Sequence, residues 1–307
     1  MQNRHKKYLK AISLSIFFVA AVYIVALIVV IDEEKLNALT SVQWYLFALV
    51  VFFALASYLV RFIRWMVYVK PLQKDIGITK HFFIYFSAFA LTTTPAKSGE
   101  MIRSIYLAPL GIPYGKSVAA FFSERVLDLV AILLLAYMVL IFSFDQYKSW
   151  LFLGGLFLLT LFYLLRSSVL SKMGAKVLKG RSKKMVLDFT DSVKDNFSNH
   201  TLAKAFPLSI LAWSIQSFSL VIVAYAFGFE ANMLLLMGIY CISILAGALS
   251  FIPGGVGVAE GAMSILLISI GMDPSLAIIT SIIVRALTLW LAVGVGVVCM
   301  LILSKIF

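Results

Sequence analysis

Two charged residues recur at the same spacing in the two halves of this 307-residue chain. Arg125 follows Glu100 after 25 positions, and Arg285 follows Glu260 after the same number. A glycine lies 11 positions after each glutamate. A guanidinium can hold a phosphate group and a carboxylate can accept a proton or a cation, so both pairs are candidates for binding a charged substrate. The matched spacing indicates an internal repeat.

Each glutamate follows an interruption of an apolar segment, at residues 94–99 and 253–257. Proline removes a backbone donor and glycine frees the backbone, so a helix breaks at both places. Non-helical backbone at membrane depth persists only where protein buries it or where it lines a wet cavity. We predict that a helix begins after each break and directs free N–H groups, together with Lys97, at an anion such as phosphate. A kink that only aids packing is the alternative.

Other charged residues also lie in apolar sequence, where each costs about 2.5–3.5 kcal/mol at the membrane centre and therefore pairs or faces water. Glu124 and Asp128 share one helix face beside Arg125. The structural alternative is that ion pairs merely pin each broken segment to its neighbour. Arg61 and Arg64 are interpreted first as a helix end that snorkels to the membrane surface, and alternatively as phosphate contacts at a cytoplasmic mouth. The candidate substrate-binding residues are Arg61, Arg64, Lys97, Glu100, Arg103, Glu124, Arg125, Asp128, Pro253, Gly254, Gly255, Gly257, Glu260 and Arg285.

The composition decides which elements position these residues. The chain is 62% hydrophobic and 13% charged, with a mean hydropathy of +1.02, which is typical of an integral membrane protein. We predict an all-α, polytopic transmembrane protein. The net charge of +12 indicates an excess of Lys and Arg on the cytoplasmic side rather than a nucleic-acid partner. Apolar runs long enough to span a membrane cover residues 11–31, 42–69, 114–142, 149–166, 201–227 and 274–303.

Two further apolar regions, 81–108 and 232–270, contain the breaks. Each arm of the first is about 10–14 residues long, too short to cross a hydrocarbon core of about 30 Å. We predict that both are re-entrant helical hairpins and that they enter from opposite sides, as inverted repeats do. The whole chain, 1–307, then forms one integral membrane domain, with the N-terminus cytoplasmic. Repeat 1 covers about 42–166, repeat 2 covers about 201–303, and an amphipathic helix on the inner leaflet links them within 167–200.

Several chemistries are not indicated. The three histidines have no zinc-ligand spacing, no phosphate-binding loop for ATP occurs, and no Ser or Cys has a plausible base. We therefore expect no enzymatic activity, no catalytic residue, no metal and no cofactor.

Three segments, at 94–103, 123–128 and 252–260, resemble motifs of the membrane region of lysylphosphatidylglycerol synthases, a family of flippase-like membrane proteins. The resemblance extends over nearly the whole chain. Bifunctional synthases carry a soluble aminoacyl-transfer domain after the membrane region, whereas this sequence ends at Phe307. The resemblance thus implies the lipid-translocating part without the lipid-modifying part, and it leaves the lipid open.

These observations favour an inner-membrane lipid translocase that works by alternating access between the two hairpins. Its partner would be a phosphate-bearing or anionic membrane lipid, such as a phospholipid or a polyprenyl-phosphate-linked lipid. The alternatives are an ion-coupled small-solute transporter and a membrane enzyme that acts on lipid head groups. The formation of a homo-oligomer is left open.

Overall fold

The computed structural model describes residues 44–73, 75–143 and 180–306, together with scattered positions between 153 and 163. These described residues form helices and contain no strand, so the all-α prediction is confirmed for them. The predicted spans 11–31 and 149–166 fall on residues outside this part, apart from the scattered positions.

The first half is interrupted where the sequence predicts a break. Pro95 opens a 3₁₀ helix because its fixed φ suits a first helical position, and Gly111, with φ 91°, ends the hairpin in the left-handed conformation. The elements are α3 (Trp44–Val69), η1 (Lys70–Leu72), α4 (Ile78–Ser87), η2 (Ala88–Leu91), η3 (Pro95–Met101), α5 (Ile102–Leu107), η4 (Ala108–Leu110) and α6 (Tyr114–Ser143).

The second half repeats this order. The side chains of Asn232 and Asp273 cap the helices that follow them, and Gly257, with φ 83°, precedes the helix after the second break. The elements are α9 (Gly180–Asn196), α10 (Asn199–Ala226), α11 (Met233–Leu249), η6 (Pro253–Gly255), α12 (Val258–Ser269), α13 (Pro274–Arg285), the π-helical η7 (Ala286–Trp290) and α14 (Leu291–Ile306).

Three helical stretches among the described residues are long and apolar enough to cross a membrane. They are Trp44–Leu72, Asn199–Ala226 and Pro274–Lys305. The arms of the two broken hairpins are shorter apolar helices, such as Ile78–Leu91 and Met233–Leu249. The chain is therefore a membrane protein built from long helices and two interrupted hairpins.

The contacts between the two halves are reciprocal. Helix α3 packs along α10, α6 of the first half contacts α11 of the second, and α14 of the second contacts α4 and η2 of the first. The two breaks, η3 and η6, also contact each other. A two-fold relation requires this pattern. If one element of the first half contacts a second element of the other half, the equivalents of these two elements must also contact each other.

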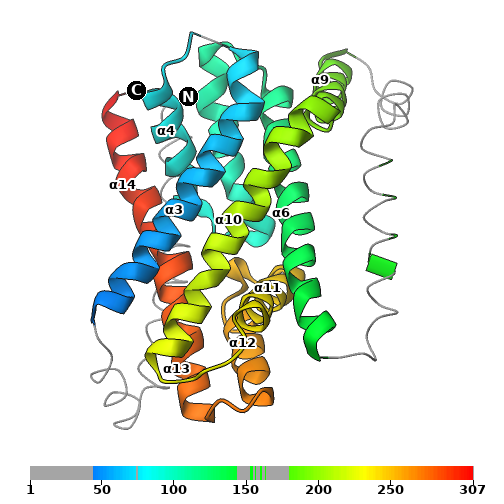
Figure 1. Cartoon of the computed structure of the whole chain (residues 1–307). Coiled ribbons are helices and arrows are strands. Elements are labelled where there is room, and N and C mark those ends of the chain that lie inside the picture. Colours follow the sequence, from blue (N-terminus) through cyan, green and yellow to red (C-terminus); the bar gives the residue numbers. More distant parts are fainter. Residues whose placement is uncertain are drawn as a thin grey trace.

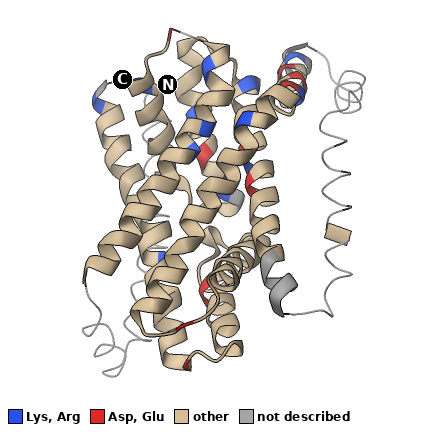
Figure 2. Ribbon diagram, viewed as in Figure 1, with Lys and Arg blue, Asp and Glu red and all other residues tan. Residues whose placement is uncertain are grey.

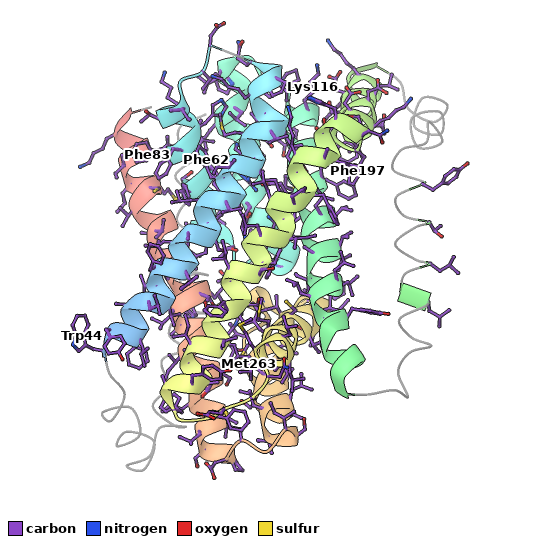
Figure 3. All side chains as sticks on the ribbon, viewed as in Figure 1. Trp44, Phe62, Phe83, Lys116, Phe197 and Met263 are labelled. Atoms are coloured by element: carbon purple, nitrogen blue, oxygen red, sulfur yellow. The ribbon has the colours of Figure 1, made fainter. Side chains whose placement is uncertain are left out.

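Helices α3 and α10 run in opposite directions (Figure 1). Trp44 marks the start of α3 at one end of the molecule, and Phe197, just before α10, lies at the other end (Figure 3). The hairpin arm α4 occupies the upper half of Figure 1, and α11 and α12 occupy the lower half. These directions support the inverted relation of the halves, which stays a prediction.

Helix α9 is amphipathic, but its apolar stripe faces the protein. Val193 and Phe197 are buried in the core, and the Phe189 ring lies 5.7 Å from that of Phe122 on α6. A Cβ on Gly115 would collide with the α9 backbone, so only glycine allows this close approach. The apolar stripe therefore packs on α6 rather than facing a membrane surface, and the place of α9 on the inner leaflet stays a prediction.

Candidate functional site

The glutamate and arginine of each predicted pair lie together. The Arg125 and Glu100 side chains are 3.7 Å apart, and Arg285 Nε donates to Glu260 Oε1 at 3.1 Å. The two glutamates lie on the helices that begin at the breaks, η3 and α12. The two arginines lie on the helices that follow the hairpins, α6 and α13. The shared spacing of 25 positions therefore has the same geometric meaning in both halves.

Glu260 also caps its own helix. Its Oε2 accepts the backbone N–H of Gly257 at 2.8 Å, and Glu260 stands at the third position of α12, where an acidic side chain favours the positive helix end. Arg285 in turn donates through Nη2 to the carbonyl oxygen of Gly254 at 2.5 Å. The pair thus ties the end of α13 to both sides of the second break.

The first half holds a larger charge network, with three arginines and three carboxylates in balance. Asp128 accepts from Arg64 at 2.6 Å and lies 3.1 Å from Arg125. Glu124 lies 2.9 Å from Arg103 and 3.6 Å from Arg64. The remaining contact is Arg103 to Glu100, at 3.2 Å. Each buried charge has an opposite partner, which is the condition under which such charges are tolerated.

Aromatic rings surround part of this network. The guanidinium of Arg103 lies 4.3 Å from the centre of the Trp65 ring and 4.8 Å from that of Tyr85. Arg103 is 1% exposed, so these cation–π contacts act without competition from water.

Arg61 and Arg64 are buried, contrary to the snorkelling interpretation. Arg64 is 0% exposed and donates to Ser209 of α10 at 2.7 Å in addition to its carboxylates. Arg61 is 5% exposed, donates to Gln216, and lies 4.2 Å from the centre of the Trp213 ring. The interpretation as a helix end that snorkels to the membrane surface is wrong because α10 packs along α3 and covers this face.

The prediction of free N–H groups at the breaks is wrong for the amides whose acceptors are identified. The amides of Lys97 and Gly99 donate to Thr94, at 2.8 Å to its carbonyl oxygen and 2.7 Å to its hydroxyl oxygen. The amide of Gly257 donates to Glu260. These amides already have acceptors within the breaks. We therefore assign anion binding at the breaks to the charged side chains.

A cavity of about 360 Å³ lies where the two breaks meet. Its basic side chains are Arg61, Lys97, Arg125 and Arg285, and its acidic side chains are Glu100 and Asp128. Its apolar lining includes residues of α6 and α11, such as Leu129, Ile132, Ile244 and Leu245. The volume falls at the small end of the range for ligand sites, about 300–1,000 Å³.

The structure divides the predicted site residues into two groups. Those that line the cavity are Arg61, Lys97, Glu100, Arg125, Asp128, Gly254, Gly255 and Arg285. Those that lie behind its wall, as ion-pair partners or parts of the second break, are Arg64, Arg103, Glu124, Pro253, Gly257 and Glu260. Arg103, Glu124 and Glu260, which the sequence made candidates for substrate binding, do not line the cavity and instead form ion pairs behind it.

Sequence reasoning missed two residues of α10. Trp213 donates its indole N–H to Asp128 at 2.9 Å, and Gln216 accepts from Arg61 and from Ser57. Both line the cavity. The available signal was Gln216, a polar side chain near the middle of an apolar span, because such a residue is costly in a membrane unless it has a partner.

The two halves differ in charge around their matched pairs. Glu100 and Glu260 are 160 positions apart, and the same offset places Met263, Val284 and Thr288 opposite Arg103, Glu124 and Asp128. The second half therefore keeps one ion pair where the first half has a network. Among the described residues, no group of three His, Cys, Asp or Glu side chains could hold a metal ion.

Comparison with known proteins agrees with this architecture. The family model described as the lysylphosphatidylglycerol synthase TM region matches residues 12–296. The chain belongs to this family. The match covers both breaks and both glutamate–arginine pairs, so it confirms the resemblance drawn from the motifs.

Relatives of similar length are archaeal membrane proteins. A UPF0104 membrane protein of Methanocaldococcus jannaschii is 24% identical over 268 residues, which cover 79% of this chain and 80% of the relative. A UPF0104 membrane protein of Pyrococcus horikoshii is 21% identical over 295 residues, with 85% and 88% covered. One from Methanothermobacter thermautotrophicus is 32% identical over 104 residues, about a third of each chain. These names describe membrane proteins and state no substrate.

Proposed function

We propose that this protein moves a lipid with a phosphate-bearing or anionic head group between the leaflets of a membrane. The observation that carries the proposal is the cavity between the two breaks, which is lined by four basic side chains and by apolar residues of α6 and α11. A charged head group that enters hydrocarbon loses hydration worth several kcal/mol. Arg125 and Arg285 would replace part of that hydration, while the apolar tail stays in the bilayer.

Each half supplies one cavity arginine that pairs with a glutamate of the same half. The Arg125 side chain is 21% exposed and that of Glu100 is 2% exposed, so the cation is the more accessible member of a pair that lines the cavity. An anionic head group would thus meet guanidinium groups that are already oriented. Preorientation reduces the entropy lost on binding.

The reciprocal packing of the halves supports alternating access. The breaks contact each other, and the two hairpins pack on α6 and α14 of the opposite half. A rocking motion of one hairpin against the other would open the shared cavity to each side in turn. In this proposal the hairpins are re-entrant and the repeats inverted.

Charge distribution supports a cytoplasmic assignment for one end. Most Lys and Arg of the described residues lie in the half of the molecule that holds α9, whereas acidic residues occur at both ends (Figure 2). Under the positive-inside rule the α9 end faces the cytoplasm. We propose that the protein resides in the inner membrane in this orientation, with a cytoplasmic N-terminus, and that it catalyses no covalent step.

Lipid exchange in proteoliposomes tests the proposal. Fluorescent phosphatidylglycerol and phosphatidic acid would be reconstituted with the protein, and dithionite would report the fraction in the outer leaflet over time. A labelled neutral glycolipid is the lipid control. We expect faster exchange of at least one phosphate-bearing lipid, and slower exchange with Arg125→Leu or Arg285→Leu than with the matched control Lys204→Leu. Lys204 is exposed on α10 and does not line the cavity.

Size-exclusion profiles would show that the variants remain folded. If no lipid exchanges faster, with a proton gradient of either sign, the translocase proposal fails and a small-solute transporter becomes the better account. If the arginine variants exchange lipid at the control rate, the cavity is not the path.

A further inference from the structure

Two cations on the cavity wall differ from the others in having no acidic partner. Among the described residues, no carboxylate oxygen lies within 4.0 Å of Arg61 or Lys97, whereas Arg125 has two carboxylate partners and Arg285 has one. Arg61 is 5% exposed, and its Nε is buried without a hydrogen-bond acceptor. Its one hydrogen-bond acceptor, Gln216, is neutral.

Trp213 brings these two cations together. The Arg61 guanidinium lies 4.2 Å and the Lys97 ammonium 6.0 Å from the centre of its ring. Its indole N–H donates to Asp128, which also accepts from Arg64 and pairs with Arg125. Asp128 is therefore shared among three other donors, and among the described residues neither cation beside the ring has a carboxylate oxygen within 4.0 Å.

The backbone conformation of Lys97 also indicates a functional role for this residue. Lys97 has φ 55°, a left-handed conformation that costs free energy for any residue with a Cβ. Three positions before the matched glutamate of the second half, Gly257 also has a positive φ, of 83°. The first half thus has a lysine where the second has the residue that fits without strain. Strain of this kind occurs where a side chain must be held in place for function.

The charge count around the cavity identifies what this site would hold. Four basic and four acidic residues form the network and the matched pairs, so Arg61 and Lys97 add an excess of two positive charges. A phosphate monoester carries about −1.5 to −2 charges at pH 7. A phosphodiester, with one acidic oxygen, carries about half of that.

We propose that Arg61 and Lys97, beside the Trp213 ring, form a binding site for a phosphate monoester dianion. The proposal rests on the proposed function and narrows its substrate class to head groups that end in a monoester phosphate. The bound dianion would neutralise the excess charge of the cavity, which favours binding because buried uncompensated charge is costly. Arg125 and Arg285, whose charges are paired with carboxylates, line the cavity around the bound dianion.

Equilibrium binding to the full-length protein in detergent tests this site. Isothermal titration would compare short-chain phosphatidic acid, a monoester, with short-chain phosphatidylglycerol, a diester, and with inorganic phosphate. We expect phosphatidic acid to bind about tenfold or more tightly than phosphatidylglycerol. Arg61→Gln and Lys97→Gln should each weaken phosphatidic acid binding by about 10- to 100-fold, as the loss of one charge-assisted hydrogen bond would. Lys204→Gln, the exposed control, should leave affinity unchanged.

Lys97→Gly guards against a variant that merely misfolds. It installs the residue found at the matched position, so it should raise the unfolding temperature while weakening phosphatidic acid binding. If inorganic phosphate binds as tightly as phosphatidic acid, the phosphate-binding site stands and its ligand is a soluble phosphate rather than a lipid. Equal affinity for monoester and diester lipids, or full affinity in Lys97→Gly, would overturn the site.

The outcomes separate this site from the transport proposal. If the protein speeds phosphatidylglycerol exchange while binding shows no monoester preference, the site fails and the translocase stands. If the monoester binds selectively but no lipid exchanges faster, the site stands and the translocase fails.

Discussion

The charge network of the first half predicts a rescue experiment. Glu124 is 0% exposed and lies between Arg64 and Arg103, at 3.6 and 2.9 Å. Glu124→Val leaves three arginines facing two carboxylates inside the protein. Arg103→Met together with Glu124→Val leaves two of each, and it installs the residue types that stand at Met263 and Val284 in the second half.

The magnitudes follow from this balance. Removal of one partner of a buried ion pair costs about 3–5 kcal/mol, whereas replacement of both by apolar residues of similar volume is often neutral. The single variant should therefore unfold on the order of 10 °C below the unaltered protein. The double variant should recover most of that difference. Its recovery is incomplete because Arg103 also stacks on Trp65 and Tyr85.

The chain carries its own reporter for the assay. Cys241 and Cys299 are its two cysteines, and both are free and buried. A thiol-reactive dye would label them as the detergent-purified protein unfolds on heating. An unchanged unfolding temperature for Glu124→Val would refute the buried network, and a double variant as unstable as the single one would refute the argument from charge balance.

Three further predictions concern topology, packing and the aromatic residue of the cavity. In a cysteine-free background, Tyr114→Cys and Ser269→Cys should react with an impermeant thiol reagent from opposite sides of the membrane, and reaction of both from one side would exclude inverted repeats. Gly296→Ala should destabilise the protein by about 1–3 kcal/mol, measured by thermal unfolding, because its Cβ would collide with the backbone of η2. Gly294→Ala, on the same helix with open space around it, should not, and equal effects would contradict this packing. Trp213→Phe keeps a ring but loses the N–H to Asp128, so it should slow lipid exchange less than Arg125→Leu; a larger loss would show that the indole N–H matters more than the cation.

Local pattern was enough to locate the breaks and the matched pairs. Pro95 and Gly257 interrupt helices through their own backbone geometry, which no distant residue needs to supply. The equal spacing of Glu100 to Arg125 and of Glu260 to Arg285 carried over directly to contact. Both signals depend on residues that are close together in the chain, so they can be recognised from the sequence alone.

The position of Arg64 was not predictable in this way. Near the end of an apolar helix, a basic residue beside aromatic residues has the pattern of a snorkelling side chain. What buries Arg64 is Ser209 of α10 and Asp128 of α6, which are 145 and 64 positions away. Likewise the apolar stripe of α9 suits a membrane surface and a protein surface equally, and only the packing of α6 shows which one it meets.

The sequence by itself determined that this is a helical membrane protein of the lysylphosphatidylglycerol synthase membrane family, with two breaks and two matched ion pairs. Composition, helix breakers and the cost of charge in hydrocarbon are local properties, so the order of residues records them. Only the tertiary structure decided which charges are neutralised. Asp128 is taken by Arg64, Arg125 and Trp213, and within the part of the chain that the structure describes this leaves Arg61 and Lys97 without an ion-pair partner. That outcome depends on how α3, α6 and α10 pack, because a carboxylate neutralises the cations that distance and geometry bring to it rather than those near it in the chain.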